Sequence, residues 1–308
     1  MRTRRIGTLE VSVVGLGCNN FGGRIDFDRS AEVVSAALDN GITFFDTADI
    51  YGGTKSEEFL GRALGKRRDD VVVASKFGMK IDDDHHGAKP DYVRQALDDS
   101  LRRLGTDRLD LYILHTPDPE TPIADTLGAL DACVKEGKVR EIGCSNFSAE
   151  QLRQAEAAAG GGARFVSVQN EYSLLQRAPE SAVLPECRRA GLAFVPYFPL
   201  ASGLLTGKYK KGEPPPAGGR LSGMPPEHFA ALNDRLDIVA QLTAWAEKSG
   251  HSILDLAVSW LLGRSPVASV IAGATTRQQV EANAAAGDWV LDEAQMAEVD
   301  ALAPAPAG

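Results

Sequence analysis

The sequence has little cysteine and no excess of positive charge. Its four cysteines, Cys18, Cys133, Cys144 and Cys187, lie far apart and form no Cys-x-x-Cys pair. This spacing argues against a zinc ribbon, a thioredoxin-like site and a disulfide scaffold. Lysine and arginine number 33 against 42 aspartates and glutamates, a formal net charge of -9. Because nucleic-acid and anionic-membrane binders carry the opposite balance, neither partner is expected, and any anionic ligand must meet local positive groups.

Long apolar runs are also missing. The longest uncharged stretch, residues 191–207, contains Pro196 and Pro199 and is too short to span a bilayer. Near the N-terminus, Glu10 interrupts the apolar residues that follow the early arginines, and no small-residue cleavage site follows. A secretory signal peptide is therefore not expected. These features predict a soluble, cytoplasmic protein with reduced thiols.

Apolar content and periodicity indicate a folded α/β protein. Hydrophobic residues make up 44% of the chain, as in a folded protein. The length of 308 residues suits either two average domains or one (β/α) barrel of about 250 residues with additions. Short β-branched runs alternate with segments of helical spacing, which predicts βα units and a parallel sheet. The expected strands are residues 13–16, 42–45, 71–74, 109–114, 139–143, 165–168, 193–196 and 267–272. The expected helices are residues 30–40, 56–64, 91–104, 123–136, 149–159, 180–190, 232–249, 252–264, 276–286 and 292–302.

Local signals support these boundaries. Residues 54–57, Thr-Lys-Ser-Glu, fit a capping box at the start of the second helix. Gly105, Gly137 and Gly191 follow helical runs and are expected to end them. Residues 15–20 resemble a dinucleotide-binding fingerprint, but the third glycine is replaced by asparagine and no helix opens directly after them. With eight βα units and no composition shift that marks a linker, a single (β/α)8 TIM barrel is favoured over a doubly wound sheet.

The chain is expected to form one domain. Residues 1–13 are expected to form a β-hairpin, residues 13–287 the barrel, and residues 288–308 a C-terminal helix and a tail. The tail, from residue 303, is expected to be frayed. The segment 204–232 is long and rich in glycine, proline and lysine, which is typical of a functional or mobile loop.

Four residues with chemical potential stand at neighbouring strand ends. Asp46 ends the second strand, Tyr51 lies in the loop after it, Lys76 ends the third strand and His115 ends the fourth. In a parallel barrel the active site forms at the carboxyl ends of the strands. Each residue alone also fits an ordinary structural role, such as a loop cap or a core histidine. Their joint placement on one rim favours a catalytic site.

The joint chemistry of these residues is carbonyl reduction or its reverse. A phenol has a pKa of about 10, and a neighbouring ammonium such as that of Lys76 lowers it by stabilising the phenolate. Asp46 would keep Lys76 charged, and His115 can donate a hydrogen bond to a substrate oxygen. None of these groups supplies a hydride, so a nicotinamide cofactor is implied.

Several motifs in order resemble the aldo-keto reductase superfamily, in particular its bacterial-type NADPH-dependent members. They are the run Gly-Ile-Thr-Phe-Phe-Asp-Thr-Ala-Asp-Ile-Tyr-Gly at 41–52 with Ser56, Glu57, Leu60 and Gly61, and the segments 74–76, 110–115, 137–147, 169–172 and 271–283. The resemblance covers nearly the whole chain. It implies a TIM barrel and an oxidoreductase that transfers a hydride from NADPH to an aldehyde or ketone, reversibly with the alcohol.

The resemblance also implies roles for individual residues. Asp46, Tyr51, Lys76 and His115 match the family's catalytic tetrad, with Tyr51 as general acid. Ser145, Asn146 and Gln169 match the residues that bind the nicotinamide carboxamide, and Tyr197 the residue that stacks on its ring. The remaining implied cofactor residues are Phe198, Pro199, Leu200, Ser202, Gly203 and Lys208 over the pyrophosphate, and Gly273, Thr275, Arg277, Gln279 and Asn283 at the adenosine.

The adenosine end departs from the family pattern. Thr275 stands where many members have lysine or arginine, and Ala282 where an acid is often found. Arg277 is expected to reach the 2'-phosphate instead. NADPH is the expected cofactor, with NADH as an alternative.

Other features concern the substrate and partners. Residues 82–86, Asp-Asp-Asp-His-His, have metal-ligand side chains, but successive positions on a loop converge poorly, so no metal site is expected. Selectivity for a small-molecule carbonyl substrate is expected from loops 19–27, 80–88, 116–119 and 204–224. A homo-oligomer is left open.

Two other functions fit parts of the pattern. One is a barrel lyase or aldolase in which Lys76 forms a Schiff base, although Asp46 beside it would keep the amine protonated. The other is a non-catalytic cofactor sensor, because some members of the resembled superfamily serve as regulatory subunits of potassium channels.

Overall fold

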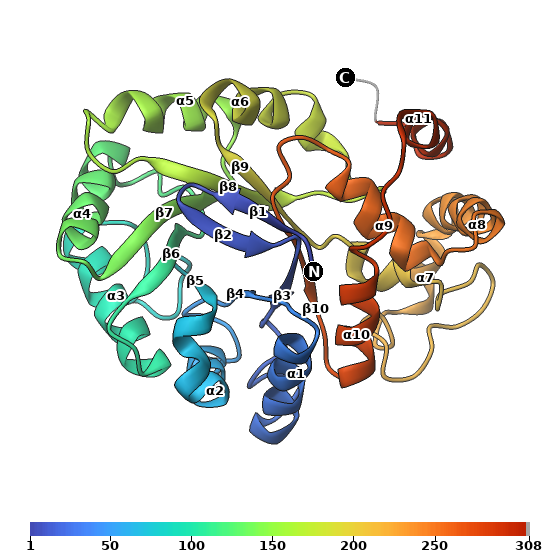
Figure 1. Cartoon of the computed structure of the whole chain (residues 1–308), viewed down its shortest axis with the longest axis horizontal. Helices are drawn as coiled ribbons and strands as arrows, with labels where there is room; N and C mark the ends of the chain where they lie inside the picture. The colour runs from blue at the N-terminus through green and yellow to red at the C-terminus, as the bar shows by residue number, and fades with distance from the viewer. Residues whose placement is uncertain (306–308) are drawn as a thin grey trace.

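Eight parallel strands form a nearly closed barrel in the computed structural model, which describes residues 1–305 (Figure 1). Residues 306–308, the end of the tail expected to be frayed, lie outside the described residues. Neighbouring strands follow the order β10-β3-β4-β5-β6-β7-β8-β9. The strands are β3 (Val14–Gly17), β4 (Phe44–Asp46), β5 (Val72–Phe77), β6 (Leu109–Leu114), β7 (Val139–Ser145), β8 (Phe165–Glu171), β9 (Ala193–Tyr197) and β10 (Val270–Gly273). The predicted (β/α)8 barrel is confirmed.

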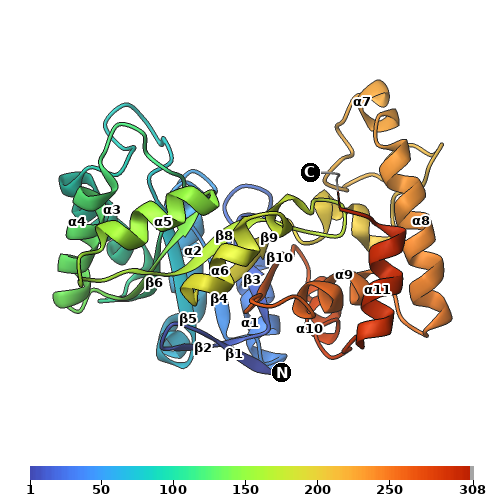
Figure 2. The same cartoon turned by 90° about the horizontal axis from the view of Figure 1, so that it is seen from above.

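Helices surround the barrel, as the alternating pattern predicted (Figure 1). The ring contains α1 (Phe27–Asp39), α2 (Lys55–Leu64), α3 (Pro90–Leu104), α4 (Ile123–Lys135), α5 (Ala149–Ala158), α6 (Val183–Ala190), α9 (Ile253–Leu262) and α10 (Arg277–Ala285). Additional helices α7 (Pro226–Ala230), α8 (Asn233–Lys248) and α11 (Glu293–Leu302) lie together to one side in both views (Figures 1 and 2). Short 3-10 turns are η1 (Gly65–Asp70), η2 (Ala178–Glu180) and η3 (Ala201–Thr206). Within the described residues, no helix has both the length and the apolar character needed to cross a membrane.

The expected last strand, residues 267–272, is divided between two neighbours. Val267 and Ala268 pair with β9, where the Ala268 N–H donates to the Phe194 carbonyl at 2.9 Å. From Val270 onward the chain pairs with β3 instead. This change of partner brings the two ends of the strand order together.

Some strands extend beyond the apolar runs that predicted them. β5 continues to Phe77 and β7 to Ser145, and Ser145 pairs with Gln169 of β8. Backbone hydrogen bonding sets these ends, so the polar residues that close each strand belong to it. The difference matters because these extensions contain Lys76, which lies behind the wall of the candidate site, and Ser145, which lies on it.

The hairpin closes the amino-terminal end of the barrel. β1 (Thr3–Ile6) and β2 (Leu9–Ser12) pair antiparallel and cross the centre of the ring in Figure 1. Ile6, Leu9 and Val11 are buried against the barrel interior, in one cluster with Phe44 and Leu111. The barrel is therefore blocked at this end, and any ligand must enter from the other.

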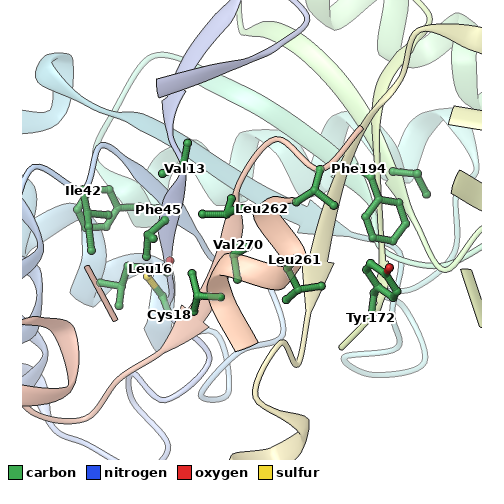
Figure 3. Packing of buried hydrophobic residues seen from close by; sticks show 14 of the residues in the cluster. Val13, Leu16, Cys18, Ile42, Phe45, Tyr172, Phe194, Leu261, Leu262 and Val270 are labelled. Atoms are coloured by element: carbon green, nitrogen blue, oxygen red, sulfur yellow. Dashed lines mark hydrogen bonds between the residues drawn. The ribbon is translucent and has the colours of Figure 1, made fainter. Parts of the chain in front are cut away.

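A second, larger core fills the layer between strands and helices. Figure 3 shows Leu16, Phe45 and Val270 from the strands near Leu261 of α9. All four side chains are buried. Apolar residues thus cover both faces of the strands, as expected for a parallel sheet with helices outside.

The predicted capping box at residues 54–57 is wrong. Thr54 has a left-handed φ of 73° and no side-chain capping bond. Glu57 is fully buried, accepts a hydrogen bond from Arg103 Nε at 2.6 Å, and is also bonded to Ser75. The buried charge pair outweighs a cap, because an ionised carboxylate inside the protein needs a cation and donors. The helix ends at Gly105, Gly137 and Gly191 are confirmed, each with a positive φ.

Gly61 provides a test of the contact between α2 and α3. A Cβ at Gly61 would lie 2.1 Å from the Leu104 carbonyl oxygen, so Gly61→Ala forces the helices apart. We expect a loss of about 3 kcal/mol in the free energy of unfolding, measured with urea. Gly128→Ala is the matched control: the added methyl meets nothing within 4 Å, so stability should rise by up to about 1 kcal/mol. Equal stability of the two variants would contradict the close contact.

Candidate active site

A cavity of about 630 Å³ opens at the carboxyl ends of the strands, opposite the hairpin. Its volume lies in the range of small-molecule and cofactor sites. Its walls come from strand ends and from the loops that follow β3, β4, β9 and β10. The predicted site residues on its wall are Asp46, Tyr51, His115, Ser145, Asn146, Gln169, Tyr197, Phe198, Pro199, Leu200, Ser202, Gly203, Lys208, Gly273, Thr275, Gln279 and Asn283.

The four rim residues predicted to form a group come together. Lys76 is fully buried, and its Nζ donates to Asp46 Oδ1 at 2.5 Å and to the Thr47 carbonyl at 2.8 Å. The same Nζ lies 3.5 Å from Tyr51 Oη. The rings of Tyr51 and His115 meet edge to face, with centroids 5.8 Å apart. Lys76 thus sits behind the cavity wall, while Tyr51 and His115 form part of it.

The loop after β4 determines where Tyr51 lies. The Asp49 N–H donates to the Lys76 carbonyl at 3.1 Å, and the Tyr51 N–H to the Ala48 carbonyl at 3.2 Å. Gly52 has a φ of 60°, and a Cβ there would lie 2.1 Å from the Phe21 carbonyl oxygen. Only glycine fits this close approach. The loop is therefore bonded to the end of β5 and packed against the loop after β3.

Burial and charge determine the protonation of these groups. Burial, and then the Lys76 charge, lower the pKa of His115 to about 3, so its imidazole is neutral near pH 7. Burial lowers the pKa of Lys76, but Asp46 and Tyr51 more than offset it, so the net shift is upward and the amine is charged. Burial raises the pKa of Tyr51 more than Lys76 lowers it. The expected lowering by Lys76 is present, but burial outweighs it and the phenol stays protonated.

A second group of predicted residues forms a connected platform beside the first. Ser145 Oγ donates to the Gln169 carbonyl at 2.7 Å, and Gln169 Nε2 donates to Asp46 Oδ2 at 2.9 Å. Tyr197 Oη donates to Asn146 Oδ1 at 2.8 Å, and Asn146 Nδ2 donates to the His115 carbonyl at 2.9 Å. These bonds link the ends of β4, β6, β7, β8 and β9 across the cavity floor.

The loop after β9 has an unusual backbone. Phe198, Ala201 and Ser202 have φ values of 49°, 46° and 58°, which non-glycine residues seldom adopt. Such strain persists where the surrounding structure imposes it, commonly at ligand sites. The loop lines the cavity and continues through η3 toward Lys208.

Of the residues expected to contact the adenosine, one lies elsewhere than expected. Gly273, Thr275, Gln279 and Asn283 lie on the cavity wall, but Arg277 does not. Its guanidinium pairs with Asp39 at 3.2 Å and Glu281 at 3.8 Å. Opposite charges on α1 and on its own helix hold Arg277 outside the cavity.

Sequence reasoning missed two arginines on the cavity wall. Arg24 donates to the Gly218 carbonyl at 3.4 Å, and Arg220 lies 4.8 Å from the centre of the Phe198 ring. Burial, and then the charge of Arg24, lower the pKa of Arg220, and both arginines line the same cavity. Both lie in loops expected to control selectivity, so a basic residue in a glycine-rich loop was the available signal. Other residues missed on the wall are Gly17, Asn19, Asn20, Met79, Thr206, Gly218, Leu254, Ile271, Ala272 and Ala282.

The other two loops expected to control selectivity contribute no residues to the cavity wall. Neither residues 80–88 nor 116–119 lie on the cavity wall, although Met79 does. In the former loop His85 Nδ1 lies 2.7 Å from Asp82 at an exposed position. Across residues 1–305, no cluster of three or more His, Cys, Asp or Glu is placed to hold a metal ion.

The chain is similar to known proteins over nearly its whole length. The model of the aldo/keto reductase family matches residues 13–304. Aldo-keto reductase str7 of Strobilurus tenacellus is 36% identical, over 98% of this chain and 91% of its own. Aldo-keto reductase yakc [NADP(+)] of Schizosaccharomyces pombe is 34% identical, over 96% of this chain and 90% of its own length. The oxidoreductase YrpG of Bacillus subtilis is 34% identical, over 97% and 94%.

The buried pair of Lys76 and Asp46 provides a test by stability. Lys76→Met leaves a carboxylate buried without its cation, so we expect a loss of about 3 kcal/mol or more in the free energy of unfolding. The double variant with Asp46→Asn should recover part of that loss, because the uncompensated charge is gone. Lys80→Met, which removes an exposed lysine from a surface pair, should change stability by less than about 1 kcal/mol. Additive losses in the double variant would contradict the coupling.

Proposed function

The chain belongs to the aldo/keto reductase family, and from that premise we propose that it transfers a hydride from NADPH to an aldehyde or ketone, with Tyr51 as the proton donor. The observation that carries the proposal is the contact of Tyr51 with Lys76 and His115 on the wall of one cavity. The reverse reaction would oxidise the alcohol at the same site. The nicotinamide, when bound, would supply or accept the hydride.

The cavity residues fit a dinucleotide. We assign the nicotinamide carboxamide to Ser145, Asn146 and Gln169, and the ring face to Tyr197, because all four lie on the wall beside Tyr51 and His115. Asn19 Oδ1 is buried without a hydrogen-bond partner within the described residues, and it lies 3.3 Å from where a Cβ of Gly273 would be. This narrow, polar strand end suits a ligand that approaches the backbone closely.

Positive groups on the wall suit the cofactor's phosphates. Lys208, Arg24 and Arg220 line the cavity, although the chain as a whole is acidic. Arginine is well suited to bidentate phosphate contacts. With Arg277 directed to Asp39, we assign the phosphate contacts to these three cations instead. They favour NADPH over NADH, because NADPH carries an additional phosphate.

The protonation states suit reduction. Tyr51 is protonated and can give its phenolic proton to the carbonyl oxygen as negative charge develops there. The charged amine of Lys76 stabilises the phenolate that remains, and Asp46 holds that amine in place. The neutral imidazole of His115 can donate a second hydrogen bond to the same oxygen. In this scheme two donors meet one substrate oxygen.

A Schiff-base mechanism through Lys76 is disfavoured. Its amine is fully buried, bonded to Asp46 at 2.5 Å and held charged by a raised pKa. A nucleophilic lysine needs a neutral amine that reaches the substrate.

Tyr51→Phe tests the proton donor. We expect NADPH oxidation with 4-nitrobenzaldehyde at pH 6 to fall by about a factor of 10³, because general acid catalysis typically contributes 10² to 10⁴. The dissociation constant of NADPH, followed by cofactor fluorescence, should change by less than about threefold, since the phenol leaves the phosphate contacts intact. Undiminished turnover would reject Tyr51 as the donor.

Arg220→Gln and Arg277→Gln separate the phosphate contacts. Loss of a charge-assisted bond costs about 1.5–3 kcal/mol, so we expect NADPH to bind about 10- to 100-fold more weakly to Arg220→Gln. Arg277→Gln, the matched control, should bind NADPH as the wild type does, because Arg277 pairs with Asp39 outside the cavity. The reverse order of effects would contradict the assignment. Parallel NADH titrations show whether Arg220 meets the 2'-phosphate or the pyrophosphate.

A further inference from the structure

One buried carboxyl, that of Asp49, lies near Tyr51 and Lys76 but has no part in the proposed proton transfer. Asp49 is 1% exposed and precedes Tyr51 by two residues in the loop between β4 and α2. Its backbone N–H donates to the Lys76 carbonyl at 3.1 Å. Within the part of the chain that the structure describes, neither carboxyl oxygen of Asp49 has a hydrogen-bond partner. An ionised carboxylate in that position would be strongly unfavourable.

The cations near Asp49, Arg103 and Lys76, are already paired with other acids. Glu57 on α2 binds Arg103 of α3 at 2.6 Å and is also bonded to Ser75 of β5. Lys76 on β5 binds Asp46 at 2.5 Å. The remaining titratable groups that face Asp49 are the phenols of Tyr92 on α3 and Tyr112 on β6, both with raised pKa values. Asp49 therefore has a negative neighbour in Glu57 and no cation of its own.

The consequence is a carboxyl that titrates near neutrality. Burial, and then the charge of Glu57, raise the pKa of Asp49 from its ordinary 3.8 to about 7, against the opposing effects of Arg103, the nearby Ile50 backbone N–H and Lys76. By contrast, the pKa of His115 is lowered to about 3, and those of Tyr51 and Lys76 are raised. Of these four groups, Asp49 alone changes charge between pH 6 and pH 8.

We propose that Asp49 is a positioning residue that must be uncharged for its loop to hold Tyr51 against Lys76 and His115. When Asp49 ionises, the new carboxylate repels Glu57 and requires water, and the loop that carries it must shift outward. Tyr51 belongs to the same short loop, so its phenol leaves the substrate oxygen. The proposal rests on the proposed function, because its kinetic effect is read through proton transfer from Tyr51.

Asp49 also makes stability depend on pH in a defined direction. Below about pH 4 the carboxyl is protonated in both the folded and unfolded chain, and no penalty arises. Between about pH 4 and 7 the folded chain retains the proton that the unfolded chain has lost, so stability falls as pH rises. Above about pH 7 both states have lost the proton, and the free energy of unfolding stays lowered by the full amount. His115 acts oppositely, since its lowered pKa makes stability rise with pH up to about 6.5.

Asp49→Asn, which mimics the uncharged form, tests the proposal. We expect wild-type kcat/KM for NADPH-dependent aldehyde reduction to fall about tenfold per pH unit above pH 7, as for a single essential protonated group. Asp49→Asn should match the wild type at pH 6 within about threefold and show no such fall up to pH 9. Glu58→Gln, an exposed neighbour of Glu57 paired with Arg62, should retain the wild-type profile. A wild-type alkaline fall in Asp49→Asn, or a uniform loss at every pH, overturns the proposal.

Two measurements without turnover separate this proposal from the proposed function. The difference in melting temperature between Asp49→Asn and the wild type should grow from pH 4 to 7 and then stay constant. Infrared difference spectra of the wild type should lose a protonated-carboxyl band as pH passes 7. If the wild type reduces no aldehyde at any pH but both signatures appear, the proposed function fails and the buried neutral carboxyl stands. Absence of the infrared band overturns the role of Asp49.

Discussion

The buried pair of Lys76 and Asp46 organises the site. Two adjacent strands, β4 and β5, place an ammonium and a carboxylate 2.5 Å apart, and both side chains are buried. Such a pair is tolerated only when further hydrogen bonds satisfy both groups, and here the Thr47 carbonyl and Gln169 Nε2 do so. Burial lowers the pKa of His115, and the charge of Lys76 lowers it further. The same charge lowers the pKa of Tyr51, against the larger effect of burial. The protonation of the rim thus follows from burial acting together with one ion pair.

The barrel places this pair at the end of the strands where the cavity opens. The hairpin closes the amino-terminal end with Ile6, Leu9 and Val11, so the cavity opens only where the strands end. Parallel strands bring their final residues to one rim, although those residues are far apart in the chain. Hydrogen bonds between Ser145, Asn146, Gln169 and Tyr197 then connect the strand ends into one floor. A preorganised floor lets the site orient a ligand without first paying to order its own side chains.

Positive charge is concentrated at the cavity, although the protein as a whole is acidic. The chain carries a net charge of -9, yet Arg24, Lys208 and Arg220 line one cavity. Mutual repulsion of Arg24 and Arg220 is consistent with a site that an anion would stabilise. Elsewhere, Asp49 has an acidic neighbour in Glu57, and the nearby arginine, Arg103, is bonded to Glu57. The proposed pH response arises from that imbalance.

The sequence alone determined the alternation of strands and helices, the barrel, the family resemblance and the group at Asp46, Tyr51, Lys76 and His115. The elements, the barrel and the rim group rest on local periodicity and on the rule that parallel strands end together, and the family resemblance rests on several motifs in order along the chain. Only the tertiary structure decided that Arg277 pairs with Asp39 while Arg24 and Arg220 line one cavity, since residues roughly two hundred or more positions apart carry no local signal. It also decided that Glu57 binds Arg103 rather than capping α2, and that Asp49 is buried without a cation. The reason is physical: burial and charge pairing depend on which elements pack together, and spacing along the chain does not encode that.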